Sequence, residues 1–466
     1  MIGGGIAGLT VALLCKREGA RVALVEAGRV GGGVTGCTTA KVSALQSTMY
    51  STILSRHGVE TASVYAQASR RGVELIAELA TEESIDCDLH RRRAVTYAAN
   101  GSELASVEKE ADAAREAGLP VELTDAIDLP YHVVGAVRLD EQLEFHPVRY
   151  LRGLADALDG GGSTIFEDTR ALGVEHGAPC RVRTPQSTIS AAQVVDAAHY
   201  PLLDRGLMFA RLEPMRSYCI AARVRGDLPQ DMAISAGGTT RSVRSYGDLL
   251  IIGGEGHATG ANKATPERFE ALATFAREHW DVTSITHRWS AQDPIPYDHL
   301  PVVGRYGPGS SRIYMASGFM KWGLSGGTMA AILLSDLIAG RDNSWSSTFS
   351  PTRISGRSLP TLAKLNSKVA VDFIGDRVKP SGGRKADAVP RGEARVLRHG
   401  LGRKGVYRDE AGSLHAVSLR CTHLGCLLRF NSAERSWDCP CHGSRFDVDG
   451  GVLEGPATRP LSPRSP

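Results

Sequence analysis

The 466-residue sequence contains no apolar run that approaches the ~20 residues needed to span a bilayer. The stretch Met329–Ile338 is too short and instead predicts a helix of the core. Residues 2–8 form a glycine motif, not the charged start and apolar centre of a signal peptide. The formal net charge is only +3, which gives no reason to expect nucleic acid as a partner. We therefore expect a protein without a membrane span that acts in the cytoplasm.

Cysteine pairs with metal-ligand spacing are missing from most of the chain. Five of the nine cysteines are scattered, and we expect them to be free thiols in a reducing compartment. These five are Cys15, Cys37, Cys87, Cys180 and Cys219. The other four lie close together near the C-terminus, which predicts a site there.

That C-terminal segment contains the motifs Cys421-x-His423 and Cys439-x-x-His442. Two cysteines and two histidines in this pattern are what a mixed-ligand [2Fe–2S] cluster requires. Cys421 and Cys439 would hold one iron, and His423 and His442 the other. Tetrahedral zinc also uses such ligands, but zinc does not explain the additional cysteines or the Gly-Ser pair after His442. The pattern predicts a centre that carries electrons.

About the last 80 residues resemble Rieske domains, in particular those of cytochrome bc complexes. The resemblance implies an antiparallel β sandwich and a disulfide between Cys426 and Cys441 that joins the two ligand loops. It also implies that Ser444 donates a hydrogen bond to a cluster sulfur. A tyrosine that donates a second such bond is replaced here by Phe446, so we expect a lower reduction potential than in those complexes.

At the other end of the chain, the motif Gly3-x-Gly5-x-x-Gly8 precedes a helix pattern and a strand that ends at Glu26. This order is typical of a dinucleotide-binding fold. Gly3 permits the tight turn, Gly5 lets the pyrophosphate approach the backbone, and Gly8 lets the helix pack on the sheet. Glu26 would accept hydrogen bonds from the adenosine ribose. The strand expected before Gly3 is reduced to two residues.

Further segments, in order along residues 1–340, resemble the D-amino acid oxidase-like superfamily, which includes glycine oxidase and sarcosine oxidase. They are residues 31–42, Phe145–Pro147, Val194–Ala198, Gly253–His257, Leu300–Gly304 and residues 316–327. The resemblance implies FAD as cofactor. The residues expected to bind it are Gly3, Gly5, Ile6, Ala7, Gly8, Glu26, Thr38, Thr39, Ala40, Gly318, Gly323, Leu324 and Ser325. No second strand–GxGxxG–helix unit follows, which argues against a reductase that also binds NAD(P).

The sequence thus predicts an α/β flavin domain with an interleaved mixed-sheet substrate domain (residues 1–340), a linker with a helix (341–385) and an all-β Rieske domain (386–466). Residues 362–378 should form the linker helix, and Lys379–Lys385 has the composition of a flexible segment. Apolar spacing also predicts a helix over Glu74–Leu79 and a strand over Thr188–Val195.

The combined resemblances imply an FAD-dependent oxidation of a small amine or amino acid, with electrons passed one at a time to the Rieske cluster. Lys321 is the candidate for stabilising the reduced flavin, and a surface lysine is the alternative. Tyr218 and Arg288 are weaker candidates for substrate contact, and structural roles are the alternative for both.

Two other functions stay open. The protein could be a reductase component that serves a separate oxygenase, or a redox sensor. Residues 384–466 hold 14 Lys+Arg against 9 Asp+Glu, which would suit an acidic external electron acceptor, and a solvated basic surface is the alternative.

Overall fold

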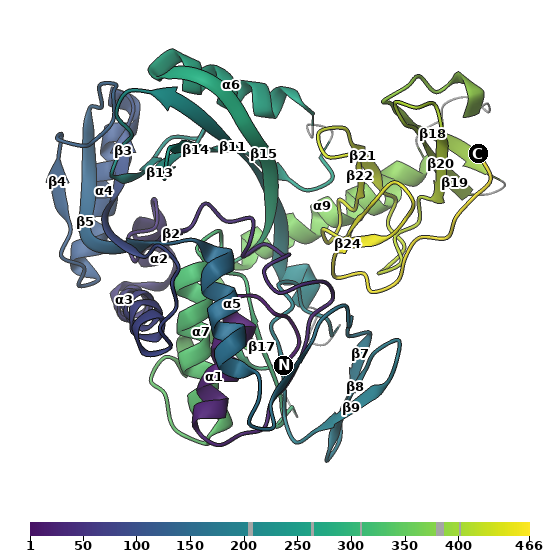
Figure 1. Ribbon diagram of the computed structural model, residues 1–466, viewed down its shortest axis with the longest axis horizontal. Helices are drawn as coiled ribbons and strands as arrows, with labels where there is room; N and C mark the ends of the chain where they lie inside the picture. Colours follow the sequence, from purple (N-terminus) through teal and green to yellow (C-terminus); the bar gives the residue numbers. More distant parts are fainter. Residues whose placement is uncertain (204–207, 262–264, 308–309, 379–385, 400–401) are drawn as a thin grey trace.

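The computed structural model describes residues 1–203, 208–261, 265–307, 310–378, 386–399 and 402–466. A larger N-terminal part, from α1 to η2, adjoins a smaller C-terminal domain, from η3 to β24 (Figure 1). No helix in these described residues is long and apolar enough to cross a membrane. The architecture is the predicted one: an α/β part with an interleaved mixed sheet, followed by an all-β domain.

The core of the N-terminal part is a parallel arrangement around the first residues of the chain. Ile2 pairs with both Val25 and Asp196, and its N–H donates to the carbonyl oxygen of Val195 at 2.9 Å. Met1 and Ile2 therefore fill the central position of the sheet. The flanking strands are β1 (Ala23–Val25), β6 (Thr164–Phe166), β10 (Val194–Asp196), β17 (Ile313–Ser317) and β16 (Val302–Arg305).

Helices pack closely beside this sheet because glycines remove side chains at the crossings. A Cβ at Gly327 would lie 3.0 Å from Ile6, where α7 crosses α1, and a Cβ at Gly72 would collide with the carbonyl of Ser325, where α3 crosses α7. The helices of this part are α1 (Ile6–Arg17), α2 (Met49–His57), α3 (Val59–Glu82), α4 (Gly101–Glu116), α5 (Pro147–Leu158), α6 (Glu267–His279), α7 (Gly323–Ile338) and α8 (Ser346–Phe349).

A second, larger sheet is strongly curled, as Figure 1 shows. Its order is β15 (Asp281–Pro296), β11 (Leu212–Arg225), β14 (Leu249–Ala258), β13 (Arg241–Tyr246), β12 (Met232–Ser235), β3 (His90–Ala98), β5 (Gly135–Glu144) and β2 (Lys41–Val42), with β4 (Glu122–Thr124) beside β5. A small separate sheet contains β7 (Gly173–Glu175), β8 (Cys180–Arg183) and β9 (Thr188–Ala191). The single strand expected over Thr188–Val195 is thus two strands in two sheets.

The C-terminal domain is built from two antiparallel sheets. One contains β18 (Ala394–His399), β19 (Gly402–Arg408) and β20 (Leu414–Ser418), and the other β21 (Arg429–Asn431), β22 (Ser436–Asp438), β23 (Arg445–Phe446) and β24 (Val452–Glu454). Short helices η1 (Met208–Arg211), η2 (Gly356–Ser358) and η3 (Ala386–Ala388) complete the elements.

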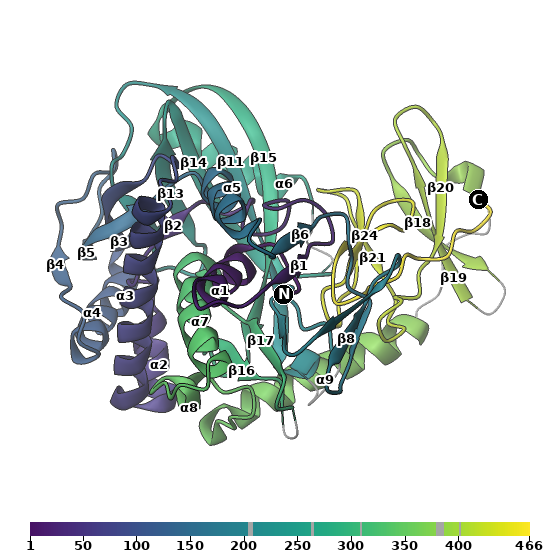
Figure 2. The ribbon, with the colours of Figure 1, turned by 60° about the horizontal axis from the view of Figure 1, so that its bottom comes forward.

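The linker helix α9 (Leu359–Val378) runs from the N-terminal part toward the C-terminal domain in both views (Figures 1 and 2). It is held to the N-terminal part by Asn366, whose side chain donates to the carbonyl oxygen of Ala210 at 3.1 Å, and by Lys368, which pairs with Glu213 at 2.6 Å. The segment Lys379–Lys385, predicted to be flexible, lies outside the described residues. The helix predicted at Glu74–Leu79 is the end of the longer α3.

The two parts are joined by a buried network of charges. Arg216 of β11 is 1% exposed and forms ion pairs with Glu434 and Glu454 of the C-terminal domain. Arg445 pairs with the same two glutamates and with Asp438. Burial alone would raise the pKa of Glu434, but Arg445 and Arg216 outweigh it and hold that pKa below its usual range. Ionised Glu434 therefore stabilises the folded protein at pH values above the usual glutamate pKa.

We expect Arg216→Ala to lower the unfolding free energy by about 3–5 kcal/mol, because it leaves buried carboxylates without one of their partners. Urea denaturation measures the change. The matched control is Arg288→Ala on the neighbouring strand β15. Arg288 pairs with Glu270 at 2.7 Å with side chains 45% and 53% exposed, so its loss should cost at most about 1 kcal/mol. Equal effects of the two substitutions would contradict the network's role.

Candidate functional site

A cavity of about 1110 Å³ extends from the glycine turn to the inner face of the curled sheet. Its outer end is lined by residues 2–7 and by Glu26. Its inner end is lined by the segment 319–324 and by side chains of β11 and β15. Residues 452–458 of the C-terminal domain also line it, and Arg170 donates to the carbonyl oxygen of Val452 at 3.2 Å. The cavity is therefore closed by both parts of the chain.

The outer end has the features that a dinucleotide pyrophosphate needs. Gly5 caps α1 without a side chain of its own. Thr35 accepts the N–H of Ile6 at 3.3 Å, and the rest of the first turn presents further backbone N–H groups and a positive dipole end. A Cβ at Gly3 would lie 2.6 Å from the carbonyl oxygen of Ala197, so only glycine fits this turn. Glu26 accepts from the N–H of Gly4 at 2.7 Å and retains acceptor sites for a ribose hydroxyl.

At the inner end, the segment before α7 turns sharply into the cavity. Met320 and Lys321 both have positive φ values, 53° and 75°, a conformation that side chains rarely adopt. Asp293 of β15 accepts a hydrogen bond from the backbone N–H of Lys321 and helps to fix this turn. Lys321 thus lines the cavity together with Gly323 and Leu324.

The structure divides the predicted cofactor residues into two groups. Those that line the cavity are Gly3, Gly5, Ile6, Ala7, Glu26, Thr38, Thr39, Gly323 and Leu324. The other residues, Gly8, Ala40, Gly318 and Ser325, lie behind it. Gly318 allows close packing, because a Cβ there would lie 2.5 Å from Pro296, and the Ser325 hydroxyl donates to the carbonyl oxygen of Ser43 at 3.1 Å.

Tyr218 does not contact the cavity, which corrects the expectation of a substrate contact. Its side chain points to the opposite face of β11, where it is fully buried, packs against Phe269 and bonds to His257 at 3.0 Å. Strand geometry explains the difference, because the neighbours Ser217 and Cys219 line the cavity and successive side chains alternate. Arg288 also lies away from the cavity, because it is on the surface and pairs with Glu270.

Lys41 is a cavity residue to which the sequence analysis gave no role. Its ammonium group donates to the carbonyl oxygen of Ala233 at 2.7 Å. Burial, together with the nearby Arg244, lowers the pKa of Lys41 to about 7. Its position two residues after Thr39, in the segment expected beside the flavin, was the available signal in the sequence.

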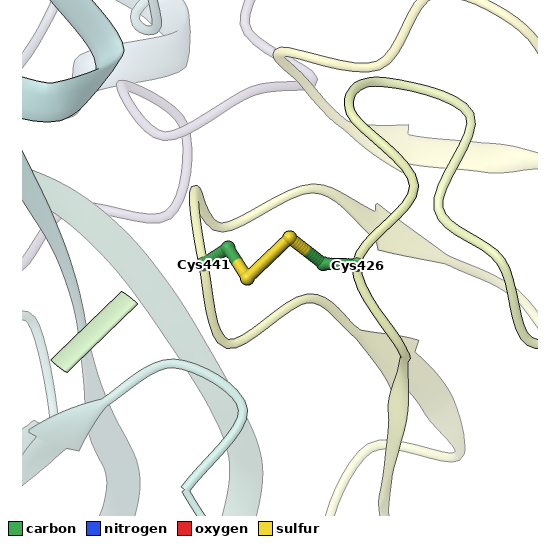
Figure 3. Close-up of a disulfide and its surroundings, with 2 residues drawn as sticks. All are labelled: Cys426 and Cys441. Carbon is green, nitrogen blue, oxygen red and sulfur yellow. A yellow bond between two sulfur atoms is a disulfide. The ribbon is translucent and has the colours of Figure 1, made fainter. Parts of the chain in front are cut away.

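In the C-terminal domain, the two ligand loops meet as the cysteine and histidine pattern requires. Cys421 and Cys439 are buried, and the rings of His423 and His442 have centroids 5.2 Å apart. The loops are joined by a disulfide between Cys426 and Cys441, the pairing that the resemblance implies (Figure 3).

The donor atoms fit a mixed-ligand cluster. Nδ1 of His442 is buried and has no hydrogen-bond partner among the described residues, as expected of an atom that would bind iron. Burial and the neighbouring His423 lower the pKa of His442 to about 3, so the imidazole is neutral, the form that metals bind. A hydrogen bond from Cys439 lowers the pKa of Cys421 to about 7. These residues would hold the iron atoms, with histidine ligands favouring a high potential.

Ser444 and Phe446 both lie beside the expected cysteine ligands. The Ser444 hydroxyl bonds to the sulfur of Cys421, and its oxygen also accepts the N–H of Ala457 at 3.0 Å. Phe446 is fully buried in the same apolar cluster as Cys421 and Cys439. The hydroxyl is thus in place to stabilise negative charge on a cluster sulfur, and the phenyl ring has no donor to add.

The cavity and the ligand loops lie on opposite faces of the same pair of strands, β11 and β15. Met215 pairs with Asp293 and Ser217 with Ala291, and all four line the cavity. The intervening residues point to the C-terminal domain. The side-chain contacts on that face are Arg216 and Ser290 to Glu434, Gln292 to Gly443, and Pro214 beside Gly443. The paired strands therefore form a wall one strand layer thick between the cavity and the ligand loop at Gly443, while residues 452–458 of the C-terminal domain line the cavity directly.

The histidine edge of the cluster site also faces the N-terminal part. Phe209 of η1 packs edge-on against His442, with ring centroids 4.6 Å apart, and against His423 at 5.6 Å. Sequence reasoning gave the expected ligands but not the wall or Phe209. The alternation of apolar and polar residues over Trp289–Gln292 was the available signal for the wall.

We expect Glu26→Ala to weaken FAD binding by roughly tenfold to a hundredfold, because a charge-assisted hydrogen bond is worth about 1.5–3 kcal/mol. Fluorescence titration of the apoprotein with FAD measures this change. The cluster spectrum should be unaltered. Unchanged FAD affinity, or a preference for NAD, would count against the assignment of Glu26 to the ribose.

We expect Ser444→Ala to lower the cluster potential and Phe446→Tyr to raise it, each by tens of millivolts, since about 59 mV corresponds to a tenfold change for one electron. The reason is that each hydroxyl donor stabilises the more negative, reduced cluster. Redox titration followed by electron paramagnetic resonance measures both potentials. If neither substitution moves the potential, hydrogen bonds from these positions do not tune the cluster.

Comparison with known proteins agrees with both halves of this description. Residues 1–337 match the family described as FAD dependent oxidoreductase, and residues 384–463 match the Rieske [2Fe-2S] domain. The chain is 33% identical over 468 residues to the Rieske 2Fe-2S iron-sulfur protein YhfW of Bacillus subtilis (strain 168), an alignment that covers 99% of this chain and 92% of that protein.

Two further relatives cover the N-terminal part. Gamma-glutamylputrescine oxidoreductase of Escherichia coli (strain K12) is 26% identical over 364 residues, 73% of this chain and 83% of that protein. The crystal structure of glycine oxidase from Geobacillus kaustophilus has the same fold, with a TM-score of 0.65 at 20% identity over 76% of this chain and 98% of that one. The chain therefore belongs to the FAD dependent oxidoreductase family and carries a Rieske [2Fe-2S] domain, and its cofactors are FAD and a [2Fe-2S] cluster.

Proposed function

We propose that this protein oxidises a C–N bond of an amine or amino acid in the FAD pocket and passes the electrons, one at a time, to its own Rieske cluster. The observation that carries the proposal is the shared wall. Met215, Ser217 and Asp293 face the pocket, while Arg216 and Gln292 on the same strands hold the cluster domain. Such an arrangement suits a donor and an acceptor that exchange electrons within one chain.

The choice of substrate class rests on the relatives and on the pocket. The names gamma-glutamylputrescine oxidoreductase and glycine oxidase refer to an amine and to an amino acid. The pocket leaves ample room beyond the glycine turn for a small molecule at its inner end, beside Ser217 and Gly256. A small amine or amino acid is therefore the substrate that we infer.

The chain's own residues would prepare this inner end for reaction. Lys321 and the N-terminal N–H groups of α7 offer positive charge and dipole toward the cavity, which would stabilise a reduced, anionic flavin. Asp293 holds the Lys321 turn through its backbone N–H. Bound FAD supplies the two-electron chemistry of C–N oxidation, and the cluster supplies one-electron steps.

The overall reaction balances with a one-electron acceptor outside the chain. An amine that becomes an imine loses two electrons and two protons, and water then releases the carbonyl product. The cluster accepts one electron at a time, so two electrons leave in two successive steps. An acidic one-electron carrier would suit the positive charge of residues 384–466.

An anaerobic screen of amines and amino acids tests the proposal. We expect a true substrate to bleach the flavin absorbance and then to produce the electron paramagnetic resonance signal of a reduced Rieske cluster. In the control variant Cys439→Ser, which removes an expected iron ligand, the flavin should still bleach but no such signal should appear.

Each other outcome of this screen has a definite meaning. A substrate that bleaches the flavin while the cluster stays oxidised would contradict internal electron transfer. Reduction by no amine or amino acid, together with reduction by a redox protein, would favour the role of an electron-transfer component or sensor.

A further inference from the structure

Gln292 is fully buried in the wall between the pocket and the cluster domain. Its side-chain N–H donates to the carbonyl oxygen of Gly443 at 2.8 Å, and its side-chain oxygen accepts the hydroxyl of Thr259 at 2.6 Å. Because the carbonyl of Gly443 can only accept a hydrogen bond, it must face the N–H end of the amide, and this fixes the orientation of Gln292 with its oxygen toward the Thr259 hydroxyl. Gly443 directly follows the expected iron ligand His442.

The backbone of Gln292 is bonded to the pocket side of the same wall. Its carbonyl oxygen lies 2.6 Å from Nε2 of His199, a residue that lines the cavity. A carbonyl only accepts, so Nε2 of His199 carries the proton in this contact. His199 is itself fixed, since its carbonyl oxygen accepts the hydroxyl of Ser317 at 2.5 Å. A continuous series of bonds thus runs from the cavity lining to a ligand loop.

We propose that Gln292 is the positioning residue through which electrons cross from the FAD pocket to the Rieske cluster. The proposal rests on the proposed function, because it needs the flavin to be the cluster's donor. The path leads from His199 through Gln292 to Gly443, and by one peptide link to His442. Every step of this path, from His199 to His442, is a hydrogen bond or a covalent bond.

The contacts of Arg216 and Ser290 hold the domain without reaching a ligand loop. Arg216 and Ser290 bind Glu434, which lies in the turn between β21 and β22. Their loss should weaken docking but leave the path intact. Ser290 is on the same face of β15 as Gln292 and two residues away, which makes it a matched control.

The step itself is a single electron transfer. The reduced flavin loses one electron, one iron of the cluster changes from Fe(III) to Fe(II), and a proton leaves the pocket for solvent. No further reactant is consumed in this step. Its rate depends on the distance and bonding between the two cofactors and on their potentials.

The experiment compares the wild type with Gln292→Leu and Ser290→Ala by laser-flash photoreduction of bound FAD, which needs no substrate. Absorbance follows flavin reoxidation and cluster reduction. We expect the transfer to slow at least about tenfold in Gln292→Leu, the size of effect typical of residues that orient metal ligands. In Ser290→Ala we expect it to stay within about twofold of wild type. Potentials of both cofactors, measured on the same samples, should not change.

A second variant keeps the test decisive if Gln292→Leu fails to bind its cofactors. Thr259→Val removes the hydroxyl that orients the Gln292 amide, and we expect a smaller slowing of the same transfer. Wild-type speed in whichever of these two variants holds both cofactors would overturn the proposal. Equal slowing in Ser290→Ala, or a fall in potential large enough to explain the rate, would also overturn it. Absence of transfer in the wild type would instead refute the proposed function, and this inference with it.

Discussion

The arrangement of this protein depends on the alternation of side chains along two paired strands. On β11 and β15, odd-numbered residues such as Met215 and Asp293 face the cofactor cavity, and even-numbered residues such as Arg216 and Gln292 face the cluster domain. Successive side chains of a strand point to opposite faces, so one pair of strands can line two sites. A shift of register by one residue would exchange the two sets and destroy both sites.

The charges across this wall explain why the cluster domain adopts one position. Arg216 is almost completely buried, and its partners Glu434 and Glu454 both belong to the other domain. A buried charge without its partner is costly, so the domain cannot slide or rotate on the wall without a large penalty. Arg445, in the cluster domain, pairs with the same two glutamates and fixes their positions beside Arg216.

Features set by neighbours in sequence were predictable, and features set by distant pairing were not. The glycine turn with Glu26 and the two ligand motifs are local, so the sequence predicted the fold class and both cofactors. The lower bound of α3 at Val59 was missed because most residues that its first turns bury are small or polar, such as Ala62, Ala66 and Ser69, and give only a weak apolar pattern. Tyr218 was only a weak candidate for substrate contact, and the structure gives it the structural role that was its alternative, since sequence alone does not fix which face of a strand meets the cavity. The partnership of Arg216 with Glu434 spans 218 positions and has no local signal.

The orientation of the cluster site bears on where its electrons come from. In this structure the edge that carries His423 and His442 packs against Phe209, and Gly443 meets the wall at Gln292. A cluster that served only an external donor would gain nothing from burying its histidine edge inside its own chain. The buried charges of Arg216 and its partners hold that edge in place, and the same strands line the flavin pocket. The position of the domain therefore supports the proposal that the flavin is an internal donor to the cluster.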